Sequence, residues 1–109
     1  MDVEYGNPKL KTLCEDRRTA TRQLGNSSAR RLGTRLSELF AASCVGDLVA
    51  GNPHPLKGDR SDEFSVKLSG GDRLVFECNN DPVPLIESDS VDWPCVTSVL
   101  ITYVGDYHD

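Results

Sequence analysis

The chain has 109 residues, of which 38% are hydrophobic and 27% are charged. This length predicts one domain over residues 1–109, and the composition is typical of a globular protein and not of a disordered one. The apolar run from Val99 to Ile101 is far shorter than the roughly 20 residues of a membrane span, and Met1 to Tyr5 lacks the basic and apolar regions of a signal peptide. We therefore expect a soluble, cytoplasmic protein with no membrane partner.

The four cysteines show no metal-binding pattern. Cys14, Cys44, Cys78 and Cys95 are 30, 34 and 17 residues apart, with no CxxC pair among them. Proteins of the cytoplasm keep their thiols reduced. We therefore expect four reduced and mostly buried thiols, no structural zinc site and no cofactor.

The net charge of −5 is unevenly distributed along the chain. Residues 1–60 carry ten lysines and arginines against seven acidic residues, whereas residues 61–109 carry two against ten. An acidic protein is unsuited to binding nucleic acid over much of its surface, because basic residues supply most of the affinity for nucleic acid. A local basic site formed by the first half is still compatible with these charges.

The first half of the chain predicts a short strand and two amphipathic helices. Val3 to Tyr5 is the strand, and Pro8 suits the first position of a helix that extends to about Leu24. After Gly25, Asn26 or Ser27 can cap a second helix. Its apolar face has steps of three and four residues and comprises Ala29, Leu32, Leu36, Leu39, Phe40 and Ser43, with Arg30, Arg31 and Arg35 elsewhere on the helix.

The second half predicts a sheet. Residues 51–60 form a loop, and Phe64 to Leu68 then alternate with period two before a turn at Gly70 and Gly71 and a strand from Arg73 to Glu77. Residues 79–94 hold three prolines and several acids, which predicts an irregular excursion before a last strand from Val96 to Val104. Helices followed by a meander predict an α+β fold, with one small antiparallel sheet and the helices on one face.

Two segments contain more reactive and charged residue types than a simple connecting loop requires. One is the proline-stiffened loop from His54 to Arg60, and the other is the end of the last strand. Each feature alone is more often solvated or structural, but together they indicate a site if the antiparallel sheet brings them to one face. The candidate residues are His54, Lys57, Arg60, Lys67, Arg73, Asp106, Tyr107 and His108.

The order and spacing of HPLKGDR, FSVKLSGGDRLVFE and the terminal DYH resemble the HigB-like branch of the RelE/ParE toxin superfamily. The likeness covers residues 3–108, and the tract from Asn80 to Pro84 resembles long-loop members called killer proteins of plasmid maintenance systems. The resemblance implies a RelE-like antiparallel sheet packed by two N-terminal helices. It also implies a type II toxin of a bacterial toxin–antitoxin system.

Such a toxin is a metal-independent endoribonuclease that cleaves mRNA on the ribosome and inhibits growth. The resemblance implies a HigA-like helix-turn-helix antitoxin as partner, and operator DNA would be contacted only through that antitoxin. The positions carried over as catalytic are His54, Lys57, Arg73, Asp106, Tyr107 and His108, with Lys67 and Arg60 as substrate-binding cations.

These residue types suit the chemistry. Metal-free RNA cleavage uses the ribose 2′-OH as nucleophile and needs a general base and a general acid, which favours His108 and His54 without deciding which has which role. A lysine such as Lys57 can act as base only if its pKa is lowered. The guanidinium of Arg73 suits a pentacoordinate phosphate. Tyr107 can stack on a base or bind phosphate, and Asp106 can orient His108.

Two alternatives stay open at this point. The superfamily also contains gyrase inhibitors of the ParE type, which share the fold and lack a nuclease site. The acidic net charge is unusual for a toxin that enters the ribosome, so a catalytically inactive domain that only binds its antitoxin is a second alternative. Fold alone does not distinguish these functions.

Overall fold

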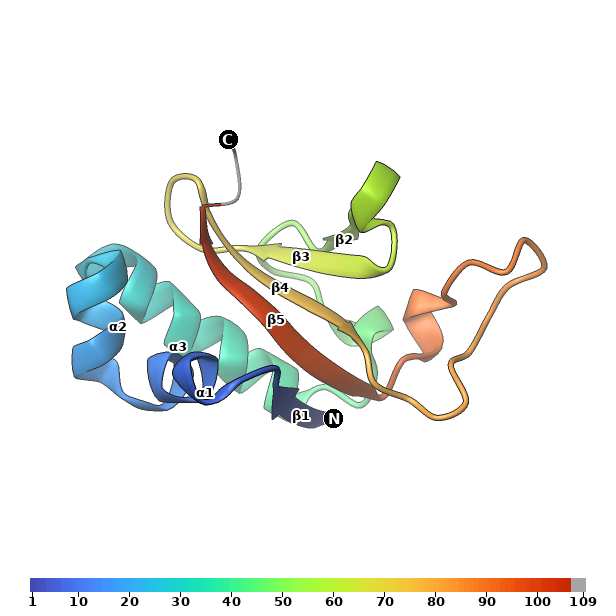
Figure 1. Ribbon diagram of the computed structural model, residues 1–109, viewed down its shortest axis with the longest axis horizontal. Helices are drawn as coiled ribbons and strands as arrows, with labels where there is room; N and C mark the ends of the chain where they lie inside the picture. Colours follow the sequence, from blue (N-terminus) through green and yellow to red (C-terminus); the bar gives the residue numbers. More distant parts are fainter. Residues whose placement is uncertain (107–109) are drawn as a thin grey trace.

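A computed structural model describes residues 1–106 of the chain. Within this range five strands form one sheet in the order β1-β5-β4-β3-β2, and the helices lie against one face (Figure 1). The strands are β1 (Asp2–Tyr5), β2 (His54–Pro55), β3 (Glu63–Lys67), β4 (Asp72–Cys78) and β5 (Ser98–Asp106). The predicted α+β class is confirmed.

The sheet is mixed and not purely antiparallel as predicted. β2 to β5 form the expected antiparallel part, but β1 pairs with β5 in parallel, with Val3 opposite Val99. The partners β1 and β5 are separated by almost the whole chain, so no local pattern could indicate their direction. The β3–β4 hairpin matches the prediction, including its turn around Gly70, which has a φ of 58°.

Three helices replace the two that were predicted: α1 (Pro8–Glu15), α2 (Arg17–Leu24) and α3 (Asn26–Ala41). The first predicted helix is interrupted at Asp16, whose carboxylate accepts hydrogen bonds from the Arg18 backbone N–H and the Thr19 hydroxyl. A carboxylate that caps new N–H groups starts a new helix, which explains the break. Gly25 precedes α3 without a side-chain cap, so neither Asn26 nor Ser27 has the predicted role.

The core lies between α3 and the sheet. It joins Leu32, Leu36 and Leu39 of α3 to Leu74, Phe76 and Ile101 of β4 and β5. Two predictions for α3 are wrong: Phe40 is 54% exposed, and Arg35 is buried. Arg35 pairs with Glu38 at 2.8 Å and donates from Nε to the Lys67 carbonyl at 3.1 Å, so its buried charge is compensated.

Residues 79–94 form the predicted excursion, but its end belongs to the core. Trp93, which starts a short 3₁₀ turn (Trp93–Cys95), lies with its ring centroid 5.0 Å from that of Phe64 and 6.3 Å from that of Phe76. At the other end, the Asn80 side chain accepts hydrogen bonds from the backbone N–H groups of Thr97 and Ser98. The excursion projects from the end of the molecule remote from the β3–β4 turn (Figure 1).

All four cysteines are free, as predicted, but they are not mostly buried. Cys95 is exposed and the other three are half-buried. Burial, followed by the charge of Glu15, raises the pKa of the Cys14 thiol to about 12. Within residues 1–106 no helix is long and apolar enough to cross a membrane, and no group of three or more metal-ligating side chains is present.

Candidate functional site

The face of the sheet that points away from the helices gathers several of the candidate residues. Residues directly opposite each other on neighbouring strands share a face. One row across the four antiparallel strands is therefore His54, Ser65, Val75 and Tyr103, and the next row contains Lys67, Arg73 and Gly105. We call this surface the open face because it points away from the helices, although its central residues Ser65 and Val75 are themselves fully buried. The prediction that the candidates converge holds for His54, Lys67 and Arg73.

Lys67 and Arg73 are direct cross-strand partners at the ends of β3 and β4. Lys67 is exposed and Arg73 is half-buried. Two like charges in this position destabilise a hairpin. The pair therefore forms a local positive site to which an anion would bind favourably.

A residue that follows a turn is usually exposed and makes no contacts. Arg73 differs, because the turn itself holds its side chain. Its Nη1 donates hydrogen bonds to the carbonyl oxygens of Gly70 and Asp72, each at 3.0 Å. The turn is in turn fixed by α3, because the buried Ser28 hydroxyl lies 2.6 Å from the Asp72 carboxylate and 3.4 Å from the Ser69 carbonyl. Ser28 was missed, since a serine in a helix has no local signal for such a contact.

His54 lies on β2, a two-residue strand within the segment that was predicted as loop. Its Nδ1 is 2.7 Å from the Asn52 carbonyl oxygen. Because a carbonyl oxygen only accepts, Nδ1 is the donor of this hydrogen bond, and Nε2 takes no part in it. From a strand spacing of about 4.8 Å and a rise of about 3.4 Å per residue, the Cα atoms of His54 and Arg73 are about 12 Å apart.

A second cluster on the open face centres on Glu63, which the sequence analysis did not select. Its Oε1 is 3.0 Å from Nε of Arg60, and its Oε2 accepts a hydrogen bond from the Thr102 hydroxyl at 3.0 Å. The guanidinium of Arg60 also lies 5.9 Å from the centre of the Tyr103 ring. Arg60 is therefore linked both to Glu63 and to the Tyr103 ring. A glutamate that begins a strand carries no sequence signal that would have identified it.

The structure does not bring the remaining candidates to the Lys67–Arg73 pair in the part of the chain that it describes. Lys57 is exposed and immediately precedes a 3₁₀ turn (Gly58–Arg60). Asp106 pairs with Asp72 and not with Arg73, and its carboxylate lies against Gly71. Strand alternation therefore directs Asp106 toward the helix side. Tyr107 and His108 lie outside the described residues.

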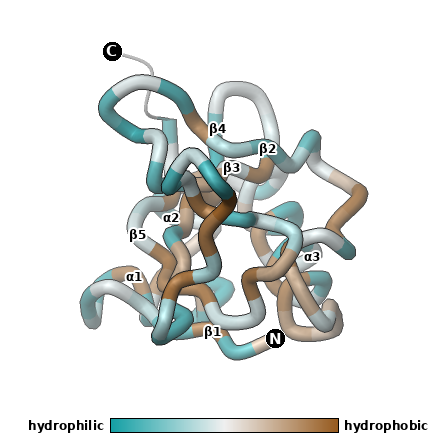
Figure 2. The backbone as a smooth tube through the Cα atoms, turned by 90° about the vertical axis from the view of Figure 1, so that its right-hand side faces the viewer, coloured by the Kyte–Doolittle hydropathy of each residue, from teal (hydrophilic) through white to brown (hydrophobic). Residues whose placement is uncertain are grey.

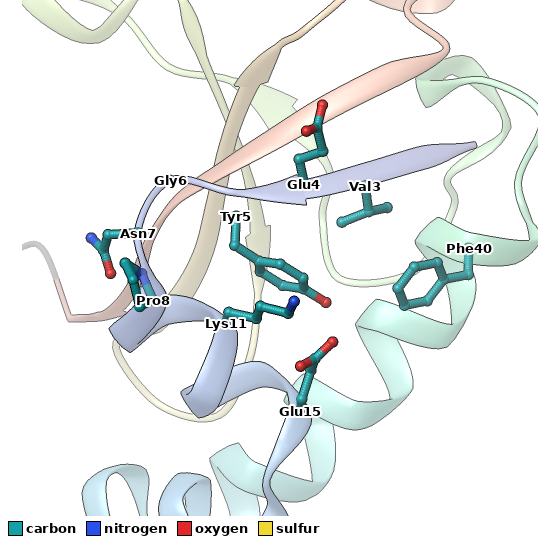
Figure 3. A pocket seen from close by; sticks show the side chains of 9 residues that line it. All are labelled: Val3, Glu4, Tyr5, Gly6, Asn7, Pro8, Lys11, Glu15 and Phe40. Atoms are coloured by element: carbon teal, nitrogen blue, oxygen red, sulfur yellow. The ribbon is translucent and has the colours of Figure 1, made fainter.

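A large hollow of about 810 Å³ at the opposite edge of the sheet contains none of the candidate residues. Tyr5, Lys11 and Glu15 point into it from β1 and α1, with Phe40 of α3 at its side (Figure 3). Burial, with the charges of Cys14 and Glu15, raises the pKa of Tyr5. This hollow is therefore separate from the candidate site that the sequence predicts.

The helices next to the β3–β4 turn add further positive charge. α2 and α3 pack on each other, and Ser28 joins them to the turn. Five arginines on these two helices are exposed: Arg17, Arg18, Arg22, Arg30 and Arg31. These arginines thus lie on the helices beside the turn that carries Lys67 and Arg73, whereas the acidic excursion projects from the other end (Figure 1).

Comparison with solved structures identifies the fold. The chain is similar to the YoeB–YefM complex from Staphylococcus aureus (TM-score 0.57, 15% identity, 100% of this chain and 98% of that one). It is also similar to a YoeB/ParE toxin from Agrobacterium tumefaciens (0.58, 13%, 99% and 100%) and to the YoeB dimer from S. aureus (0.54, 16%, 100% and 98%). The chain has the YoeB/ParE toxin fold.

The likeness covers 98–100% of each chain, so it confirms the RelE-like α+β architecture that was predicted. No protein-family model matches the sequence, and no curated protein sequence does. At 13–16% identity the comparison shows the YoeB/ParE fold and does not select the HigB branch.

Proposed function

We propose that the chain is the toxin of a type II toxin–antitoxin system and that it cleaves mRNA on the ribosome. The observation that carries this proposal is the cross-strand pair of Lys67 and Arg73 on the open face. Two cations directly opposite each other repel and so lower the stability of the hairpin. A bound phosphate would offset this repulsion. RNA supplies a phosphate at every nucleotide.

The second supporting observation is the orientation of His54. Its Nδ1–H is fixed by the Asn52 carbonyl, so Nε2 is available to take the proton of a ribose 2′-OH. The oxygen then attacks the adjacent phosphorus, and the P–O5′ bond breaks. Arg73 and Lys67 stabilise the negative charge that develops on the phosphate, and the 12 Å or so between the Cα atoms of His54 and Arg73 accommodates a ribose and its phosphate.

The leaving 5′-oxygen needs a proton, and we assign this role to His108, supported by Tyr107. Both residues lie outside the described part of the chain, so the assignment rests on the sequence motif. We also assign RNA contacts to Lys57 and Arg60, and contacts with the phosphates of flanking ribosomal RNA to the exposed arginines of α2 and α3.

We further propose that an antitoxin silences the protein, as the similarity to the YoeB–YefM complex supports. We propose the HigB branch and a HigA-like antitoxin on the sequence resemblance alone, and the cytoplasmic location stays an expectation from the sequence.

The experiment is to induce the protein in a bacterium and to follow growth, intact mRNA and plasmid supercoiling together. A ribosome-dependent nuclease stops growth and shortens mRNA while supercoiling is unchanged. Loss of supercoiling with intact mRNA would instead identify a gyrase inhibitor.

The acidic net charge favours one other function, a domain that only binds its antitoxin. In that case induction would leave growth, mRNA and supercoiling unchanged, although the protein would still bind its antitoxin. The same experiment therefore separates all three functions.

A further inference from the structure

The excursion forms one wall of an apolar groove that the proposed function does not use. The groove has a volume of about 520 Å³ and lies between the excursion and the segment that connects α3 to β3. Pro53 and Pro55 line one side, Ile86 and Val91 line the other, and Trp93 lies between them. None of these residues belongs to the Lys67–Arg73 site.

The wall made by the excursion is structured. Leu85 and Val91 form an antiparallel bridge, and the Ile86 N–H donates to the Ser90 carbonyl at 2.9 Å. Ile86 is nevertheless 49% exposed, and its neighbour Leu85 is 54% exposed. A hairpin that holds large apolar side chains in solvent next to an apolar groove indicates a surface for a binding partner.

Several acidic residues are lining residues of the groove or their sequence neighbours, and we call them its rim. Glu87 and Asp89 occupy the tip of the hairpin directly after Ile86, Asp92 lines the groove, and Asp47 is adjacent to its lining residues Gly46 and Leu48. No lysine or arginine lines the groove in the part of the chain that the structure describes. Viewed from this side, apolar and hydrophilic stretches alternate along the backbone of the excursion (Figure 2). RNA and anionic membrane surfaces would be repelled here.

We propose that this groove binds a segment of another protein that presents large apolar side chains flanked by lysine or arginine. The apolar side chains enter the groove between Pro55 and Ile86, and the cations lie next to Glu87, Asp89 and Asp92. The charge separation of the chain is then functional, because the basic end contacts RNA while the acidic end selects a basic protein segment. The groove can be occupied whether or not the protein cleaves RNA.

Trp93 provides a direct test, because it is the only tryptophan of the chain and it lines the groove. The probes are a short synthetic amphipathic peptide built of leucine and lysine and its counterpart in which glutamate replaces lysine. We expect the lysine peptide to change the Trp93 fluorescence in a saturable way, with an affinity that falls as the salt concentration rises. The glutamate peptide is expected to cause no change.

Two variants locate the binding. Neutralising the rim with Glu87→Gln, Asp89→Asn and Asp92→Asn should weaken the lysine peptide roughly fivefold or more at low salt, because rim charges set salt-dependent association. Ile86→Ser should abolish the saturable signal. The matched control is Asp2→Asn with Glu15→Gln, which removes two exposed acids from β1 and α1 and should leave the affinity unchanged.

Circular dichroism confirms that each variant is folded before titration. Equal binding of the two peptides, failure of the lysine peptide to bind, or unchanged binding by the rim variant would each overturn the proposal. A change in Trp93 fluorescence on adding duplex RNA, relieved by the lysine peptide, would also overturn it and make the groove a nucleic-acid surface. None of these results depends on nuclease activity.

Discussion

The Ser28 hydroxyl in α3 lies 2.6 Å from the Asp72 carboxylate at the start of β4, a contact that joins the helix layer to the turn holding Arg73. Ser28→Ala leaves a half-buried carboxylate without this donor. We expect a loss of about 1–3 kcal/mol in the free energy of unfolding, measured with urea, and a fall in cleavage under conditions where the variant is folded. Ser28→Thr should restore both, and Ser27→Ala, an exposed neighbour, should change neither. A Ser28→Ala variant with unchanged stability would rule out this role.

Lys67→Ala should change stability and RNA binding in opposite directions. Removing one of two opposed cations relieves repulsion across the hairpin, so the melting temperature should rise slightly at low salt and less at high salt. The affinity for RNA should fall, and the slope of log affinity against log salt should decrease by about 0.7 for one lost contact to single-stranded RNA. Lys9→Ala, on exposed α1, is the control. If RNA affinity is unchanged, Lys67 does not contact the substrate.

The reactivity of Cys95 depends on Asp92. A hydrogen bond to the Asp92 carboxylate, together with its negative charge, raises the pKa of the Cys95 thiol. Asp92→Asn should lower that pKa and increase the thiolate fraction near pH 8, so iodoacetamide should alkylate Cys95 severalfold faster, as followed by mass spectrometry. Cys14, whose pKa is raised to about 12, serves as an internal reference that stays slow in both proteins. Equal rates at Cys95 would show that Asp92 does not control it.

Local sequence patterns were sufficient for the hairpin from Glu63 to Cys78, because alternation and a glycine turn determine such a structure without distant contacts. They were not sufficient for the parallel pairing of β1 with β5, or for the burial of Arg35, because both depend on contacts between segments far apart in the chain. In the sequence, the only sign of the break between α1 and α2 is Asp16 followed by a threonine three residues later. This capping signal is weak within a long stretch of helical residues.

The candidate site was predictable to a similar extent. Lys67 and Arg73 could be selected because a short hairpin places the residues on either side of its turn opposite each other. Ser28 and Glu63 could not, since their contacts with Asp72, Arg60 and Thr102 come from tertiary packing.

The C-terminal residues can be tested by truncation. Removing His108 and Asp109 should leave the melting temperature almost unchanged, because the buried residues of β5 end at Gly105. Cleavage should fall by roughly 10²–10⁴-fold if His108 is the general acid. Asp109→Asn, which keeps the chain length, is the control. A truncated protein that cleaves mRNA at the normal rate would exclude His108 from the reaction.

The proposed cleavage of RNA depends most on the binding of its phosphate by Arg73 on the open face. The most direct measurement is single-turnover cleavage of mRNA on ribosomes programmed with one codon, comparing the wild type with Arg73→Ala and Arg73→Lys. We expect the cleavage rate to fall roughly 10²–10³-fold for Arg73→Ala and less for Arg73→Lys, with near-native folding of both variants. A folded Arg73→Ala protein that cleaves at the wild-type rate would contradict this proposal.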